Sequence, residues 1–125
     1  MPSTILVIDD NLVNLRLAAA TLRYEGYQVL TALNAKSAFD LVCSTASIDL
    51  ILMDLSLPDV DGLSFTRQLK ADPRCAHIPI VILTASTMQE DEHTALNAGA
   101  DGYITKPISV SSFPELIARH LNRSG

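Results

Sequence analysis

The chain has 125 residues, of which 48% are hydrophobic and 18% are charged, with a formal net charge of −5. This composition is typical of one folded globular domain and excludes a largely disordered chain. An acidic chain without a cluster of lysine and arginine is also a poor match for nucleic acid, because that binding depends on neutralising phosphates.

The same features bear on location and domain organisation. No apolar run approaches the roughly 20 residues needed to cross a bilayer. The first apolar run, residues 5–8, has no basic flank and ends at two aspartates, so it is not a signal peptide. We therefore expect one domain over residues 1–125, with no output domain, no membrane insertion and a cytoplasmic location.

Five short runs of valine, isoleucine and leucine predict strands. These runs do not alternate with polar residues, which is typical of strands buried on both faces. The fifth run is the weakest. In chain order they are residues 5–8, 29–32, 50–53, 80–83 and 102–105.

Segments with helical spacing separate these strands. The first helix is expected to stop at Gly26, because glycine suits a left-handed C-terminal cap. The third is expected to end before Asp72-Pro73, and the fourth at Gly99. The apolar positions that predict the five helices are Leu15, Ala18, Ala19 and Leu22; Ala38, Leu41 and Val42; Leu63, Phe65, Thr66 and Leu69; Ala95, Leu96 and Ala98; and Phe113, Leu116, Ile117 and Leu121.

Five repeats of strand then helix predict an α/β fold with a parallel sheet and helices on both faces. The crossovers should be right-handed. A closed eight-fold barrel would need roughly twice the length. An open, doubly wound sheet remains, and in such sheets ligands bind outside the carboxyl ends of the strands.

Polar side chains follow four of the five predicted strands. Asp9 and Asp10 come after the first, Asp54 ends the third, Thr84 ends the fourth and Lys106 follows the fifth. We expect them to converge at one edge of the sheet. Other polar residues near strand ends are interpreted as turn formers and helix caps, namely Asn34, Asp59 and Asp61.

Three clustered carboxylates repel one another, so this cluster is easiest to understand if a cation binds it. Oxygen ligands without histidine or cysteine favour a hard cation such as Mg²⁺. A carboxylate beside that cation can attack a phosphoryl group and form an aspartyl phosphate. Thr84 and Lys106 offer a hydroxyl and a positive charge to the phosphoryl oxygens.

These residues, in their order and spacing, resemble the receiver domains of response regulators over nearly the whole chain. The matching pieces are Asp9-Asp10, Met53-Asp54-Leu55, Leu57-Pro58 with Asp61-Gly62, Thr84-Ala85 and Lys106-Pro107. The stretch from Lys106 to Val110 is similar to single-domain receivers of the DivK type, which act in bacterial cell-cycle signalling. The resemblance implies a flavodoxin-like (βα)5 fold with strand order 2-1-3-4-5.

The resemblance also implies a role for each site residue. Asp54 would be the phosphoacceptor. The Mg²⁺ site would comprise Asp10 directly, Asp9 through water, Asp54 and the backbone carbonyl of Ser56. The phosphoryl group would be contacted by Lys106, whose peptide bond to Pro107 would be cis.

The implied function is a phosphorylation switch. A histidine kinase or a histidine phosphotransfer protein would donate the phosphoryl group. Thr84 would then move toward it and Tyr103 would turn inward. The surface of the fourth helix, fifth strand and fifth helix would relay the change to another protein, with the chain a monomer or a weak dimer.

Other interpretations stay open at this point. A phosphohydrolase resembling haloacid dehalogenases would place a second acid two residues after Asp54, where this chain has Ser56. A flavodoxin-like cofactor binder would need an anion site that Asp9-Asp10 would repel. A receiver that serves only as a docking module keeps the fold without the chemistry. The dispersed histidines His77, His93 and His120 are given no role.

The cysteines, Cys43 and Cys75, fall in a predicted helix and a predicted loop, and they form no zinc pattern. Two reduced thiols are the favoured interpretation, with a disulfide or redox role as the alternative.

Overall fold

The computed structural model describes residues 3–44, 48–54, 59, 62–84, 99–105, 115 and 117–119, without the side chains of Thr84, Tyr103 and Thr105. A five-stranded parallel sheet has the order β2-β1-β3-β4-β5, so the predicted fold class and strand order are confirmed. The strands are β1 (Thr4–Ile8), β2 (Gln28–Ala32), β3 (Leu50–Asp54), β4 (Ile80–Thr84) and β5 (Gly102–Thr105), and the helices are α1 (Leu12–Tyr24), α2 (Ala35–Ser44) and α3 (Gly62–Ala71).

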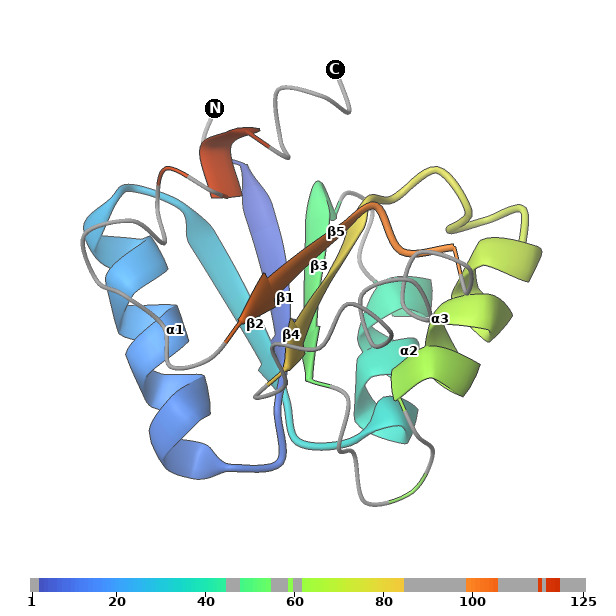
Figure 1. Ribbon diagram of the computed structural model, residues 1–125, viewed down its shortest axis with the longest axis horizontal. Helices are drawn as coiled ribbons and strands as arrows, with labels where there is room; N and C mark the ends of the chain where they lie inside the picture. Colours follow the sequence, from blue (N-terminus) through green and yellow to red (C-terminus); the bar gives the residue numbers. More distant parts are fainter. Residues whose placement is uncertain are drawn as a thin grey trace.

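Helices cover both faces of this sheet, with α1 on one side and α2 and α3 on the other (Figure 1). Successive side chains of a strand point to opposite faces, so each buried strand supplies two cores. The core toward α2 and α3 takes Leu6, Ile8, Ile51, Met53, Ile80 and Ile82. The core toward α1 takes Ile5, Val7, Leu50, Leu52, Val81 and Leu83.

The prediction that every strand is buried on both faces is wrong for β2. Gln28 and Thr31 are exposed, and Val29 and Leu30 are half-buried. The cause is position, because β2 lies at the edge of the sheet and pairs only with β1.

Helix α1 has a defined cap at each end. At its start, the side-chain oxygen of Asn11 accepts hydrogen bonds from the amides of Val13 (2.9 Å) and Asn14 (3.1 Å). At its end, Gly26 has a φ of 96°, so the predicted left-handed cap is confirmed. The predicted apolar stripe is buried in full: Leu15, Ala18, Ala19 and Leu22.

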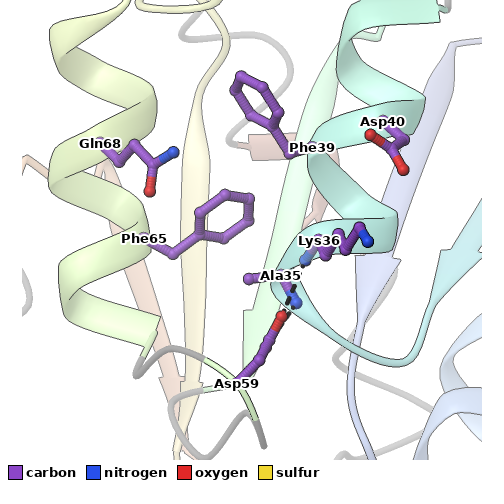
Figure 2. A pocket seen from close by; sticks show the side chains of 7 residues that line it. All are labelled: Ala35, Lys36, Phe39, Asp40, Asp59, Phe65 and Gln68. Carbon is purple, nitrogen blue, oxygen red and sulfur yellow. Dashed lines mark hydrogen bonds between the residues drawn. The ribbon is translucent and has the colours of Figure 1, made fainter.

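Helix α2 is capped by two side chains from different parts of the chain. The side chain of Asn34 accepts a hydrogen bond from an amide of the first turn at 2.8 Å. The two carboxylate oxygens of Asp59 accept from the amides of Ala35 and Lys36, each at 3.0 Å, as Figure 2 shows. The interpretation of Asn34 and Asp59 as caps is confirmed, and Asp61 lies outside the described residues. A negative charge suits this helix end.

The last two predicted helices fall mainly outside the described residues. The fourth lies there entirely, although Gly99, expected to close it, has a φ of 104°. In the fifth, residues 115 and 117–119 are helical, and Ile117 is fully buried in the core that also contains α1. The third helix ends at Ala71, before Asp72-Pro73 as predicted.

Lys70, near the end of α3, joins three segments. Its ammonium group donates hydrogen bonds to the carbonyls of Ala76 (3.3 Å) and Ile78 (2.8 Å) and to the carboxylate of Asp101 (2.8 Å). The same carboxylate oxygen accepts from the amide of Ile80 at 2.9 Å. The side chain of Lys70 is mostly buried and its contacts with the two carbonyls are partly buried, whereas Asp101 is open to water. Lys70 thus ties α3 and the connection to β4 to the residue that precedes β5.

We expect Lys70→Met to lower the free energy of unfolding by about 1–3 kcal/mol, because half-buried carbonyls and a carboxylate lose their donor while the apolar stem remains. Chemical denaturation measures the change. Lys36→Met, the same substitution at an exposed position of α2, is the matched control and should change stability little. Equal losses in the two variants would contradict this role for Lys70.

Candidate functional site

The pairing register aligns the ends of β1 and β3. Ile8 pairs with Met53, so Asp9 and Asp54 follow at neighbouring positions. Asp9, Asp10 and Asp54 each offer a carboxylate oxygen, and these oxygens lie within 4.8 Å of one another. The structure therefore brings together the three carboxylates that the sequence singled out.

The three aspartates differ in burial. Asp9 is 1% exposed and Asp54 is 6% exposed, whereas Asp10 is open to solvent. The carboxylate of Asp9 accepts a hydrogen bond from the amide of Asn11 at 2.9 Å, and its own amide donates to the carbonyl of Ala32 at 3.1 Å. Asp9 is thus held in place at the base of the site, and Asp10 lies at its rim.

The other predicted site residues are placed only in part. Asp54 pairs with Leu83, so Thr84 is the next residue along β4 and closes that strand opposite Thr105 of β5. Tyr103 pairs with Ile82 in the interior of the same strand pair. Ser56, Lys106 and Pro107 lie outside the described residues.

The donor set fits a hard divalent cation. Oxygens that share one Mg²⁺ at about 2.1 Å lie roughly 3–4 Å apart. The three carboxylate oxygens, within 4.8 Å of one another, need only a small inward shift or a bridging water to meet this spacing. A cation would also offset the repulsion that arises when carboxylates are held at this separation.

Exposed apolar side chains beside the carboxylates are a feature that the sequence reasoning missed. Leu12 is 50% exposed and Val13 is 75% exposed, and both follow Asp10 closely in the first turn of α1. Leu17 on α1 and Leu33 after β2 are also exposed. The sequence could have indicated this exposure, because none of these residues belongs to the apolar stripe that predicts the buried face of α1. Leu12 and Val13 are large apolar side chains left open to water close to Asp10 in the sequence, and a partner protein that approaches the carboxylates could cover them.

Residues 5–118 of the chain match the family of response regulator receiver domains. Among curated proteins, the chain is 39% identical over 121 residues to the polar-differentiation response regulator DivK of Brucella anthropi, covering 97% of this chain and 98% of that protein. It is 37% identical to DivK of Brucella ovis with the same coverage.

Solved structures agree with this match. A putative response regulator from Chloroflexus aurantiacus has a TM-score of 0.92 at 26% identity, covering 98% of this chain and 100% of that one. The receiver domain of sensor histidine kinase PA1611 from Pseudomonas aeruginosa has a TM-score of 0.87 at 33% identity, covering 98% of this chain and 99% of that one, and carries a magnesium ion in its active-site cleft.

Within the described ranges, none of the helices has the length and apolar character required to span a membrane.

We expect Asp10→Asn to raise the free energy of unfolding by about 1 kcal/mol in a chelating buffer, because two unit charges within 4.8 Å of each other repel with at least roughly that energy in water. Added Mg²⁺ should raise the melting temperature of the wild type and raise that of the variant less. Thermal melts with EDTA and with MgCl₂ measure both effects.

Asp40→Asn, at an exposed position of α2, is the control and should change neither quantity. If Asp10→Asn is no more stable than the wild type in EDTA, the carboxylates do not repel one another as proposed. If Mg²⁺ changes the melting temperature of neither protein, the cluster is not a cation site.

Proposed function

The chain belongs to the response regulator receiver family, and we propose that it is a phosphorylation switch with Asp54 as the phosphoacceptor. Receiver domains are signalling domains of two-component phosphoryl transfer. The observation that carries the assignment is the position of Asp54, which ends the central strand β3 with its carboxylate beside those of Asp9 and Asp10.

Asp54 suits the role of nucleophile better than its neighbours do. Asp9 is more deeply buried, at 1% exposed against 6% for Asp54. Asp10 is exposed at the rim, where water competes with a phosphoryl group. Asp54 lies between them and the ends of β4 and β5, so residues from both sides of the sheet can reach a group attached to it.

In the proposed reaction, a carboxylate oxygen of Asp54 attacks the phosphorus of a phosphohistidine. The bond from phosphorus to the histidine nitrogen breaks, and Asp54 becomes an acyl phosphate. Asp10, with Asp9 through water, Asp54 and the backbone carbonyl of Ser56 would hold Mg²⁺. When bound, Mg²⁺ supplies positive charge that offsets the charge on the phosphoryl oxygens. The magnesium ion in the Pseudomonas aeruginosa receiver, at 33% identity, supports this cation.

Residues at the ends of β4 and β5 would respond to phosphorylation. Thr84 ends β4, and Lys106 follows the last residue of β5. We propose that Lys106, through a cis peptide bond to Pro107, contacts the phosphoryl oxygens and that Thr84 moves toward them. Tyr103 would turn inward as Thr84 moves. The phosphoryl group would shift the population of two existing conformations rather than create a new one.

The proposed donor is a histidine kinase or a histidine phosphotransfer protein, in the cytoplasm. Leu12 and Val13 lie within three residues of Asp10, so a protein that brings a phosphohistidine to Asp54 would cover them. The signal would leave through the face of the fourth helix, β5 and the fifth helix, toward a second protein, with the chain a monomer or a weak dimer. The chain would accept one phosphoryl group without acting as a turnover phosphatase, since Ser56 supplies no second acid.

We expect Asp54→Asn to abolish labelling by a small phosphodonor and to abolish the response to beryllium fluoride, because the amide can neither form an acyl phosphate nor supply the carboxylate oxygen that binds beryllium. Protein NMR with and without Mg²⁺ measures the response. In the wild type, Mg²⁺-dependent shifts should extend from Asp54 to Thr84 and Tyr103.

Asp40→Asn is again the control and should respond as the wild type does. Equal shifts in Asp54→Asn and the wild type would overturn the phosphoacceptor assignment. An absence of shifts in both would favour a docking module that keeps the fold alone.

We expect Val13→Ser to slow phosphoryl transfer from a cognate histidine donor about fivefold, the factor that corresponds to about 1 kcal/mol, while labelling by a small phosphodonor stays unchanged. The reason is that a partner protein buries this side chain and a small donor does not. Rates of transfer from the phosphorylated partner measure the effect.

Tyr24→Ser is the matched control, because Tyr24 is 91% exposed on the same helix but about 16 Å further along its axis. A loss of transfer in both variants, or in neither, would show that the first turn of α1 is not the contact.

A further inference from the structure

The two cysteines line one cavity, although they are 32 positions apart in the chain. This cavity lies between the C-terminal half of α2 and the connection that follows α3. Its volume is about 200 Å³, and its walls are Phe39, Val42, Cys43, Asp72, Arg74 and Cys75. Both cysteines are free thiols.

The two thiols differ in access. Cys43 is exposed near the end of α2, whereas Cys75 is buried. The thiol of Cys75 donates a hydrogen bond to the carbonyl of Leu69 at 3.2 Å. Burial raises the pKa of Cys75, and the negative charge of Asp72 raises it further. A reagent from solution therefore meets Cys43 first and finds Cys75 as a protonated thiol behind it.

Arg74 adds a fixed positive charge to the same cavity. Its guanidinium donates hydrogen bonds to both carboxylate oxygens of Asp72, at 3.1 and 2.7 Å, and lies 5.9 Å from the centre of the Phe39 ring. The carboxylate of Asp72 and, to a smaller degree, Cys43 raise the pKa of Arg74. Asp72 offsets the charge of Arg74 and orients its guanidinium at the wall of the cavity, where the remaining N–H groups can donate to a departing oxygen.

The size and composition of the cavity restrict what it can take. Sites for small-molecule ligands usually have about 300–1,000 Å³, and this cavity is smaller, at about 200 Å³. A metal ion is also disfavoured. Among the described residues, the group of three metal-type ligands at metal spacing is the aspartate cluster, so the thiols have no third ligand of that kind. Among these possibilities, the cavity best fits a reagent of only a few atoms.

We propose that Cys43 and Cys75 form an oxidisable dithiol that reacts with a hydroperoxide and closes a disulfide between α2 and the connection from α3 to β4. The sulfur of Cys43 attacks one peroxide oxygen, and the oxygen–oxygen bond breaks. Cys43 becomes a sulfenic acid, and the peroxide leaves as an alcohol, or as water from hydrogen peroxide, with the thiol proton.

The second step uses Cys75. Its sulfur attacks the sulfur of Cys43, the sulfur–oxygen bond breaks, and hydroxide leaves with the proton of Cys75 as water. Two thiols and one hydroperoxide thus give one disulfide, one alcohol and one water. Cys75 must first give up its hydrogen bond to Leu69, and the two Cβ atoms must approach to about 3.5–4.5 Å. The second step is therefore expected to be the slower one.

The test does not depend on phosphorylation. The reduced chain is treated with one equivalent of hydrogen peroxide, the remaining thiols are alkylated, and peptides are mapped by mass spectrometry. We expect a monomer that has lost both free thiols, a cross-linked peptide pair containing Cys43 and Cys75, and full reversal by dithiothreitol. In Cys43→Ser, Cys75 should react with hydrogen peroxide at roughly a tenth of the rate of Cys43 in the wild type, or more slowly still, because the thiol of Cys75 is buried.

Cys75→Ala keeps a small apolar side chain at the buried position and should stop at the sulfenic acid, which dimedone traps on Cys43. Circular dichroism checks that both variants fold. Disulfide-linked dimers of the wild type through Cys43 would overturn the proposal. So would over-oxidation of Cys43 while Cys75 remains open to alkylation after unfolding.

Discussion

The parallel register between β1 and β3 is the constraint on which the site depends. Pairing of Ile8 with Met53 leaves Asp9 and Asp54 side by side as soon as the apolar runs end. Carboxylates at this separation oppose folding, and two of them are almost fully buried. A slip of either strand by one residue would move each of its side chains to the opposite face, into a core that is packed for side chains of other shapes. The apolar side chains on both faces of β1 and β3 therefore hold the acidic cluster in place.

Much of this arrangement could be predicted because it follows from local patterns. Runs such as Leu50 to Met53 predict a buried strand, and the residue after such a run must lie at the sheet edge. What could not be predicted depends on contacts between distant segments. The exposure of β2 follows from its place at the edge of the sheet, which the strand order of the resembled family implied but the residues of β2 do not encode. Asp59 was correctly interpreted as a cap, yet nothing in the sequence indicates that it caps α2, 24 residues earlier. The shared cavity of Cys43 and Cys75 arises in the same way.

The two sites proposed for this chain, the carboxylate cluster and the pair of cysteines, lie in different parts of the fold. The carboxylates lie at the ends of the central strands, and the exposed apolar residues of α1 lie beside them. The thiols line a cavity between the C-terminal half of α2 and the connection that follows α3. Because the two sites share no residue, substitutions at the carboxylate cluster and substitutions at the cysteine cavity should act independently, provided that α2 keeps its position.

The cap that Asp59 places on α2 bears on which changes the chain can accept over evolution. Asp59 follows Asp54 by only five residues, and its carboxylate must reach the amides of Ala35 and Lys36 (Figure 2). An insertion or deletion between Asp54 and Asp59 would withdraw the carboxylate from the helix, whereas substitutions there need not. Selection is therefore expected to act on the number of residues between Asp54 and Asp59 before their identity, and natural variation in length should occur elsewhere in the chain.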